Sequence, residues 1–126
     1  MTISLPPSTP IIDWKGTIKK HKNEKFARSL LILFSDDLPK LQAQMKKEYQ
    51  EKQLSSLART IHHIHGSCCF CVAPQLEMYS SKLESQLEKK NYSLLKEYID
   101  ELDTLINRVL TAIKPYLSQK INKKES

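Results

Sequence analysis

One segment of the chain decides the fold, and it contains a cluster of histidines, a glycine and three cysteines. It runs Ile61-His62-His63-Ile64-His65-Gly66-Ser67-Cys68-Cys69-Phe70-Cys71-Val72-Ala73-Pro74-Gln75-Leu76. Apolar residues in and just before this segment recur at steps of three and four, at Leu54, Leu57, Ile61, Ile64, Cys68 and Cys71. This spacing predicts a helix from about Gln53 to Cys71 with one buried stripe. Pro74 suits the first turn of the next helix, where its missing N–H costs nothing.

Comparable stripes predict helices on both sides of this segment. A short helix is expected from Trp14 to about Lys22, with Asp13 as its N-cap. A second helix is expected to start near Asn23, and Pro39 should kink or split it. The Lys89–Asn91 stretch predicts a turn.

A last helix should begin at about Ser93, and Pro115 should end or bend it. Outside the histidine segment, the side chains expected to face the core are Phe26, Leu30, Leu33, Phe34, Leu38, Leu41, Met45, Leu76, Tyr79, Leu83, Leu87, Leu95, Ile99, Leu102, Leu105, Ile106, Val109 and Ile113.

The overall composition supports an all-helical chain. Only two glycines occur in 126 residues, which disfavours a sheet with many tight turns. The expected architecture is all-α, an up-and-down antiparallel four-helix bundle with a short additional N-terminal helix. The expected division is a linker or arm over residues 1–10, the bundle over 11–117, and a charged tail over 118–126.

Other global features bear on the compartment. No apolar run is long enough to span a bilayer, and the first ten residues lack the pattern of a signal peptide. The three cysteines fall within four positions, which suits a reducing compartment better than a disulfide framework. These features predict a cytoplasmic protein or segment, without membrane contact of its own. The net charge of +6 favours an acidic partner surface but does not identify it.

Within the deciding segment, His62 and Gly66 stand out as candidate functional residues. At about 100° per residue, His62 points away from the stripe centred on Ile61 and Ile64, and Gly66 lies one turn later on the same side. A glycine inside a helix costs about 1 kcal/mol relative to alanine. We interpret Gly66 as an access position, because a missing side chain lets another protein approach the imidazole of His62.

The pattern from His62 to Cys68, followed by a turn into another helix, resembles the signature of the histidine phosphotransfer (HPt) family. The resemblance is strongest to the form found in BarA-type hybrid sensor histidine kinases, in which a histidine replaces the usual lysine. The Ile12-Asp13-Trp14 start and the Phe34–Leu38 segment also resemble the first helices of that family. The resemblance covers about residues 11 to 114, and the proline-rich start favours a module excised from the C-terminal end of a hybrid kinase.

The resemblance implies roles for three residues. His62 matches the phosphoacceptor, which takes a phosphoryl group from a receiver-domain aspartyl phosphate and passes it to a response-regulator aspartate. His65 matches the lysine whose cation lies near the phosphoryl oxygens. Glu84 matches a Gln or Glu that hydrogen-bonds the distal imidazole nitrogen. The domain would be a monomer without cofactor or independent catalytic activity, and Mg²⁺ would be bound by the partner receiver.

A receiver would dock on the residues that share the side of His62. Helical spacing places in this set Ser55, Ala58, Arg59, Gly66 and Cys69, with Arg59 and His65 as the nearby cations. Val72 departs from the family, which usually has a glycine there to end the helix in a left-handed conformation.

Two other functions remain open from the sequence. His62, His65 and Cys69 carry donors that zinc accepts, but no fourth ligand is evident, so we assign no metal ligand. A nucleic-acid-binding domain would agree with the basic charge. However, the lysines are scattered, and no aromatic stacking set is visible. We therefore expect no direct contact with nucleic acid.

Overall fold

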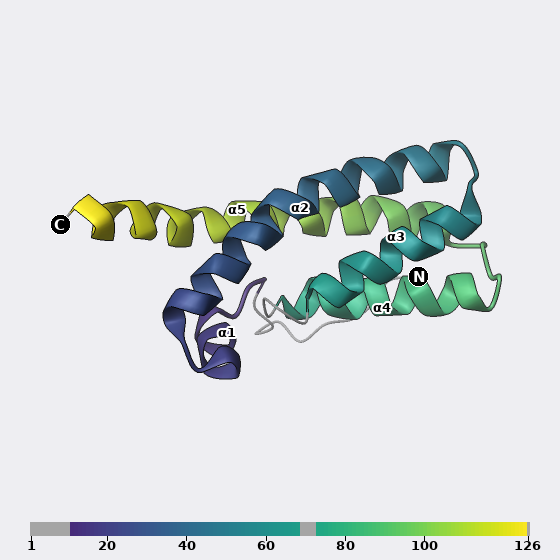
Figure 1. Ribbon diagram of the computed structural model, residues 1–126. Coiled ribbons are helices and arrows are strands. Elements are labelled where there is room, and N and C mark those ends of the chain that lie inside the picture. Colours follow the sequence, from purple (N-terminus) through teal and green to yellow (C-terminus); the bar gives the residue numbers. More distant parts are fainter. Residues whose placement is uncertain (1–10, 69–72, 126) are drawn as a thin grey trace.

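The computed structural model describes residues 11–68 and 73–125, with side chains described up to residue 117. All regular structure in these residues is helical (Figure 1). The helices are α1 (Trp14–His21), α2 (Glu24–Gln50), α3 (Leu54–Ser67), α4 (Pro74–Glu88) and α5 (Leu95–Glu125). The predicted all-α class and the short additional N-terminal helix are confirmed.

Helix α1 is held by its first turn. The Asp13 side chain caps the helix, since its Oδ1 accepts a hydrogen bond from the Gly16 backbone N–H at 2.9 Å. The Asp13 carbonyl also accepts from Thr17 Oγ1 at 2.8 Å. Lys22 ends the helix in the left-handed conformation, and Asn23 then caps α2 by accepting from the Phe26 N–H. The predicted starts of both helices are therefore confirmed.

Helix α2 runs without interruption through Pro39, so the prediction that this proline could split the helix is wrong. An internal proline costs about 3 kcal/mol because a backbone hydrogen bond is lost. The helix survives because both flanking turns are anchored in the core by Leu38 and Leu41. Its complete buried stripe steps by four and three along Ala27, Leu31, Phe34, Leu38, Leu41, Met45 and Glu48.

Two of the residues of α2 that were predicted to lie in the core are exposed. Phe26 is 52% exposed and Leu33 is 58% exposed, whereas Ala27 and Leu31 are buried in their place. The N-terminal half of α2 has more apolar residues than one stripe needs, so spacing alone allowed a stripe rotated by one position. The correct rotation leaves Phe26, Leu30 and Leu33 on a side face of the helix.

Helix α3 is shorter than predicted, because it ends at Ser67 instead of Cys71. Cys68 follows as the C-cap residue and is buried, as expected for core filler. Cys69, Cys71 and the Val72 departure lie outside the described residues. Helix α4 begins with Pro74 at its first position and buries Leu76, Tyr79, Leu83 and Leu87, as predicted.

Helix α5 also differs from the sequence prediction, since it continues through Pro115 to Glu125. Two contacts hold the chain at this proline. Tyr116 packs its ring on Trp14, with 5.3 Å between centroids, and its carbonyl accepts from Arg28 Nη1 at 2.9 Å. Arg28 also lies over the Trp14 ring, so α1, α2 and α5 are joined here.

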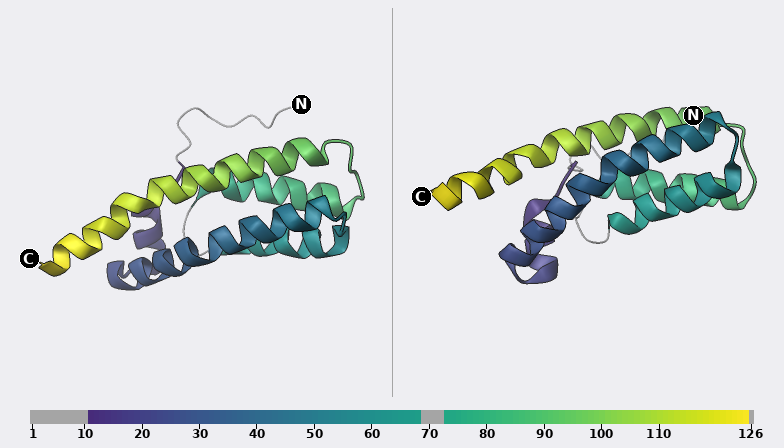
Figure 2. Two further views of the ribbon diagram at one scale, coloured as in Figure 1. Left: turned by 90° about the horizontal axis from the view of Figure 1, so that it is seen from above. Right: turned by 45° about the horizontal axis from the view of Figure 1, so that its top comes forward.

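Helices α2 to α5 form the predicted antiparallel bundle. Each packs against the next, α5 closes the ring against α2, and α1 packs against α2. Figure 2 shows that the start of α2 and the end of α5 extend beyond the ends of α3 and α4. Part of α2 therefore has no α3 or α4 neighbour beside it. None of the helices in the described part of the chain combines the length and apolar character of a membrane span.

Candidate functional site

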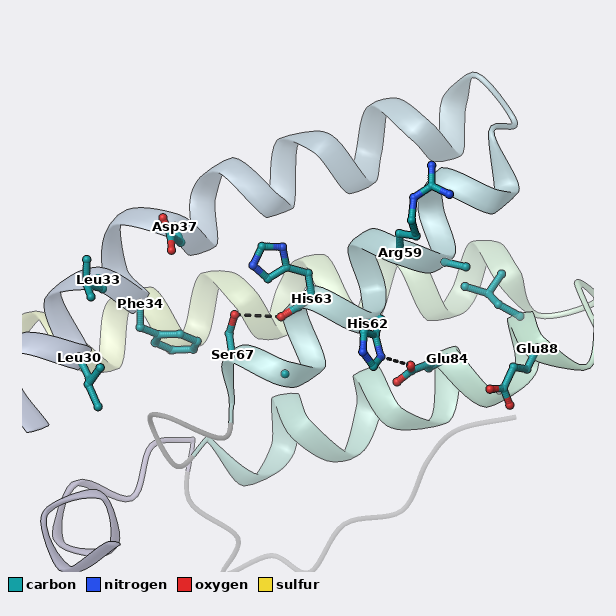
Figure 3. A pocket seen from close by; sticks show the side chains of 13 residues that line it. Leu30, Leu33, Phe34, Asp37, Arg59, His62, His63, Ser67, Glu84 and Glu88 are labelled. Atoms are coloured by element: carbon teal, nitrogen blue, oxygen red, sulfur yellow. Dashed lines mark hydrogen bonds and ion pairs between the residues drawn. The ribbon is translucent and has the colours of Figure 1, made fainter. Parts of the chain in front are cut away.

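A surface groove crosses α2, α3 and α4, and its volume is about 920 Å³. Helix α3 forms its floor, with α2 on one side and α4 on the other (Figure 3). Its lining residues are Leu30, Leu33, Phe34, Asp37, Ala58, Arg59, His62, His63, Gly66, Ser67, Glu84, Leu87 and Glu88. The groove therefore joins an apolar end on α2 to a histidine and carboxylate end between α3 and α4.

His62 lies in this groove, and 72% of its side chain is exposed, as expected for a residue that points away from the core. Its ring is turned toward α4, where Nδ1 contacts Oε2 of Glu84 (Figure 3). An ionised carboxylate only accepts hydrogen bonds, so against ionised Glu84 the donor of this contact is Nδ1. In neutral imidazole the other nitrogen, Nε2, then carries the free lone pair. With the proton on Nδ1, the contact leaves Nε2 of the neutral ring as the nitrogen available to a partner.

Glu84 also contacts a second histidine. Its other oxygen, Oε1, lies 3.0 Å from Nδ1 of His65. The structure thus brings together the three residues that the resemblance singled out. The position of His65 differs from the implied one, because its Nδ1 is directed to the Glu84 carboxylate. His65 is also absent from the lining of the groove that holds His62.

Gly66 occupies open space on the surface of α3. A Cβ atom built at this position meets no other atom within 4 Å, apart from its own helix and chain neighbours. The backbone φ of Gly66 is not positive either, so no left-handed conformation requires a glycine here. Among the described residues, neither packing nor backbone geometry explains Gly66, which agrees with its interpretation as an access position.

The predicted docking set is partly assembled in the groove. Ala58, Arg59 and Gly66 line it, and the exposed Arg59 side chain has its guanidinium within hydrogen-bond distance of Ser56 Oγ. Ser55 is exposed but does not line the groove, and Cys69 lies outside the described residues.

The sequence analysis missed the wall that α2 contributes to the groove. Leu30, Leu33, Phe34 and Asp37 form it. The sequence predicts the first three only as core residues, and of these Phe34 is buried. A signal for this wall was present in the sequence. The unbroken buried stripe from Ala27 to Glu48 does not include the apolar residues Phe26, Leu30 and Leu33, so these three are free to form a second face. His63, to which the sequence analysis assigns no role, also lines the groove and points toward α2 (Figure 3).

The zinc alternative gains no support from the described residues. No group of three or more His, Cys, Asp or Glu side chains among them is placed to hold a metal ion. Cys69, the third donor of that alternative, is not among them.

Comparison with protein families identifies the fold and its role. The family model of the Hpt domain matches residues 29–112, which include His62, His65, Gly66 and Glu84. This chain belongs to the Hpt domain family. Histidine phosphotransfer within a phosphorelay is therefore its function, and receiver domains are the class of partner. The BarA-type grouping stays a prediction.

A solved structure shows the same fold. This Hpt chain superposes with a TM-score of 0.81 on the HPT domain of an Hpt sensor hybrid histidine kinase from Shewanella. The two sequences are 24% identical, and the match covers 86% of this chain and 95% of that one. A search of the curated proteins found no significant match.

Proposed function

We propose that His62 is the phosphoacceptor of this Hpt domain. The observation that carries the proposal is the Nδ1 contact with Glu84, which in the neutral ring with its proton on Nδ1 leaves the Nε2 lone pair available in the groove. The Nε2 lone pair attacks the phosphorus of a receiver aspartyl phosphate. The bond between phosphorus and the aspartyl oxygen breaks, and the carboxylate leaves with the electron pair. Transfer to the aspartate of a response regulator is the same step in reverse.

The partner supplies what this domain lacks. Phosphoryl transfer depends mostly on positioning and on neutralising the charge of the phosphoryl oxygens. The proposed receiver brings the aspartyl phosphate and its Mg²⁺, while this domain contributes an oriented imidazole and the cation of Arg59. We propose that the domain alone has no catalytic activity, and that a hybrid kinase receiver and a response regulator are its two partners.

The groove provides the proposed docking surface. Leu33 is 58% exposed beside the partly buried Leu30 and the buried Phe34, so its side chain offers a partner an apolar contact in the groove. The apolar wall and His62 line the same groove, so one partner surface can cover both. Gly66 leaves the space between the partner and the His62 ring free of side-chain atoms.

The deciding experiment is phosphotransfer from a receiver that carries ³²P on its aspartate. Wild-type chain should acquire label that is stable in base and lost in acid, as expected for phosphohistidine. His62→Gln should acquire none, while its melting temperature stays within about 2 °C of wild type because the side chain is exposed. Full labelling of His62→Gln would contradict the assignment. Removing Mg²⁺ with a chelator before mixing should also stop the transfer.

A further inference from the structure

The carboxylate of Glu84 has two imidazole partners, and only one of them is the proposed phosphoacceptor. Oε2 contacts Nδ1 of His62, and Oε1 lies 3.0 Å from Nδ1 of His65. The His65 side chain is 30% exposed and that of Glu84 is 24% exposed, so both are more sheltered than His62. Each oxygen of one carboxylate therefore has its own ring donor.

The two rings face different surfaces. His62 and Glu84 line the groove on the α2 side, whereas His65 lines a separate groove formed with residues 74–82 of α4. The carboxylate of Glu84 lies between the rings. In imidazole the two nitrogens lie on opposite edges, so a phosphoryl group on Nε2 of His62 points away from Glu84. His65 contacts the other oxygen of that carboxylate and lines a groove separate from the one that holds His62.

A second anchor matters because a glutamate side chain is flexible. Rotation about its last bond is broad, and a single contact to His62 would leave the carboxylate free to turn. The His65 contact on the other oxygen restricts that rotation. It thereby restricts the direction from which the carboxylate accepts the Nδ1 proton of His62.

We infer that His65 is a positioning residue that acts on His62 through Glu84, and not a cation that contacts the phosphoryl oxygens. This inference rests on the proposed function of His62. In it, His65 orients the Glu84 carboxylate, the carboxylate holds the proton of His62 on Nδ1, and Nε2 is left as the nucleophile. What His65 must supply is a hydrogen-bond donor, and its charge is not required.

Substitutions at position 65 separate a donor from a cation. His65→Gln keeps a donor without any charge, His65→Lys supplies a donor with a full charge, and His65→Leu supplies neither. A positioning role predicts that Gln and Lys both resemble wild type and that Leu does not. A phosphoryl-contacting cation predicts instead that Gln behaves like Leu.

Two measurements should be made on each folded variant. Nitrogen-15 NMR of the His62 ring reports directly which nitrogen carries the proton. The rate of His62 phosphorylation by phosphoramidate reports nucleophilicity without any receiver docking, since this small donor transfers its phosphoryl group to the imidazole and releases ammonia. Lys82→Gln is the matched control, because Lys82 lines the same groove as His65 on α4.

We expect wild type, His65→Gln, His65→Lys and Lys82→Gln to show the proton on Nδ1 of His62 and equal rates. His65→Leu should show a mixture of the two tautomers and a rate about tenfold lower, the effect of one lost hydrogen bond to a charged group. If His65→Leu does not fold, His65→Ala replaces it with the same expectation.

Two results would overturn the inference. One is a folded His65→Leu or His65→Ala variant with the wild-type tautomer and rate. The other is a His65→Gln variant as slow as the variant without a donor, which would point to the cation. Failure of the proposed function looks different, because wild-type His62 would then accept no phosphoryl group from a phosphorylated receiver.

Discussion

The chain contains two glycines, both in helices, and they have opposite surroundings. A Cβ on Gly16 would lie 2.4 Å from Oδ2 of Asp13, inside the cap of α1. A Cβ on Gly66 would meet nothing within 4 Å. The fold therefore explains the first glycine and does not explain the second. From this difference we propose that Gly66 serves a partner outside the chain, and that the partner binds in the groove around it.

The largest expected effect is that of a long side chain at position 66. Gly66→Gln should reduce phosphotransfer from a receiver at least about 100-fold, since displacement of the reacting atoms by about 1 Å can have that effect. The free energy of unfolding should rise by less than about 1 kcal/mol, because glycine is a poor helix former. Transfer rates and thermal melts of the same samples check both. If Gly66→Gln accepted the phosphoryl group at the wild-type rate, Gly66 would not be needed for access by the partner.

A smaller side chain sharpens the same comparison. Gly66→Ala adds only the Cβ atom that was shown to have free space, so its stability should rise as for Gln. Its transfer rate should fall between those of wild type and Gly66→Gln. Phosphorylation by phosphoramidate, which needs no large partner, should proceed in all three proteins.

The next effect in size concerns the apolar wall of the groove. Leu33→Asp should raise the dissociation constant for a receiver about tenfold or more, which corresponds to losing the burial of one leucine. Stability should hardly change, because Leu33 is 58% exposed in the free domain. Leu38→Asp provides the contrast, since Leu38 is fully buried and its substitution should unfold the domain. Unchanged receiver binding by Leu33→Asp would exclude this wall from the docking surface.

Much of the fold was predictable because helical spacing and caps are local signals. Asp13, Asn23 and Pro74 marked helix starts correctly. The errors at the two internal prolines share one physical cause, which is that packing overrides local propensity. Pro39 and Pro115 stay inside helices because buried or aromatic neighbours on each side hold the chain.

The site was predictable only in part, because it combines three helices. The spacing of His62 and Gly66 within α3 is a local pattern, so the sequence sufficed to place them on one exposed side. The α2 wall depends on how α2 is rotated about its axis, and an excess of apolar residues made that rotation ambiguous. The contact of His65 with Glu84 joins residues on different helices, so its geometry required the structure.

A moderate effect is expected for the cation at the edge of the groove. Arg59→Ala should slow transfer from a receiver about threefold at low salt, because an exposed charge at the edge of an interface mainly affects the encounter rate. The slope of the rate against salt concentration should also become shallower. Arg59→Lys keeps the charge and should restore both. A rate independent of this charge at every salt concentration would remove Arg59 from the docking surface.

The smallest expected effect tests the other glycine, and it depends on Asp13. Asp13→Ala removes the cap of α1 and should lower the free energy of unfolding by about 1 kcal/mol. In that variant the space beside Gly16 is empty, so adding Gly16→Ala should then stabilise the domain by up to about 1 kcal/mol. In wild type the same substitution pushes the Asp13 carboxylate from its capping position, so the gain in stability should vanish or reverse.

Denaturant unfolding of the four proteins gives the difference between the two backgrounds. Phosphotransfer should be equal in all four, because α1 contributes no residue to the groove. If Gly16→Ala raised the free energy of unfolding equally in both backgrounds, the cap would not require this glycine. The proposed structural difference between Gly16 and Gly66 would then be wrong.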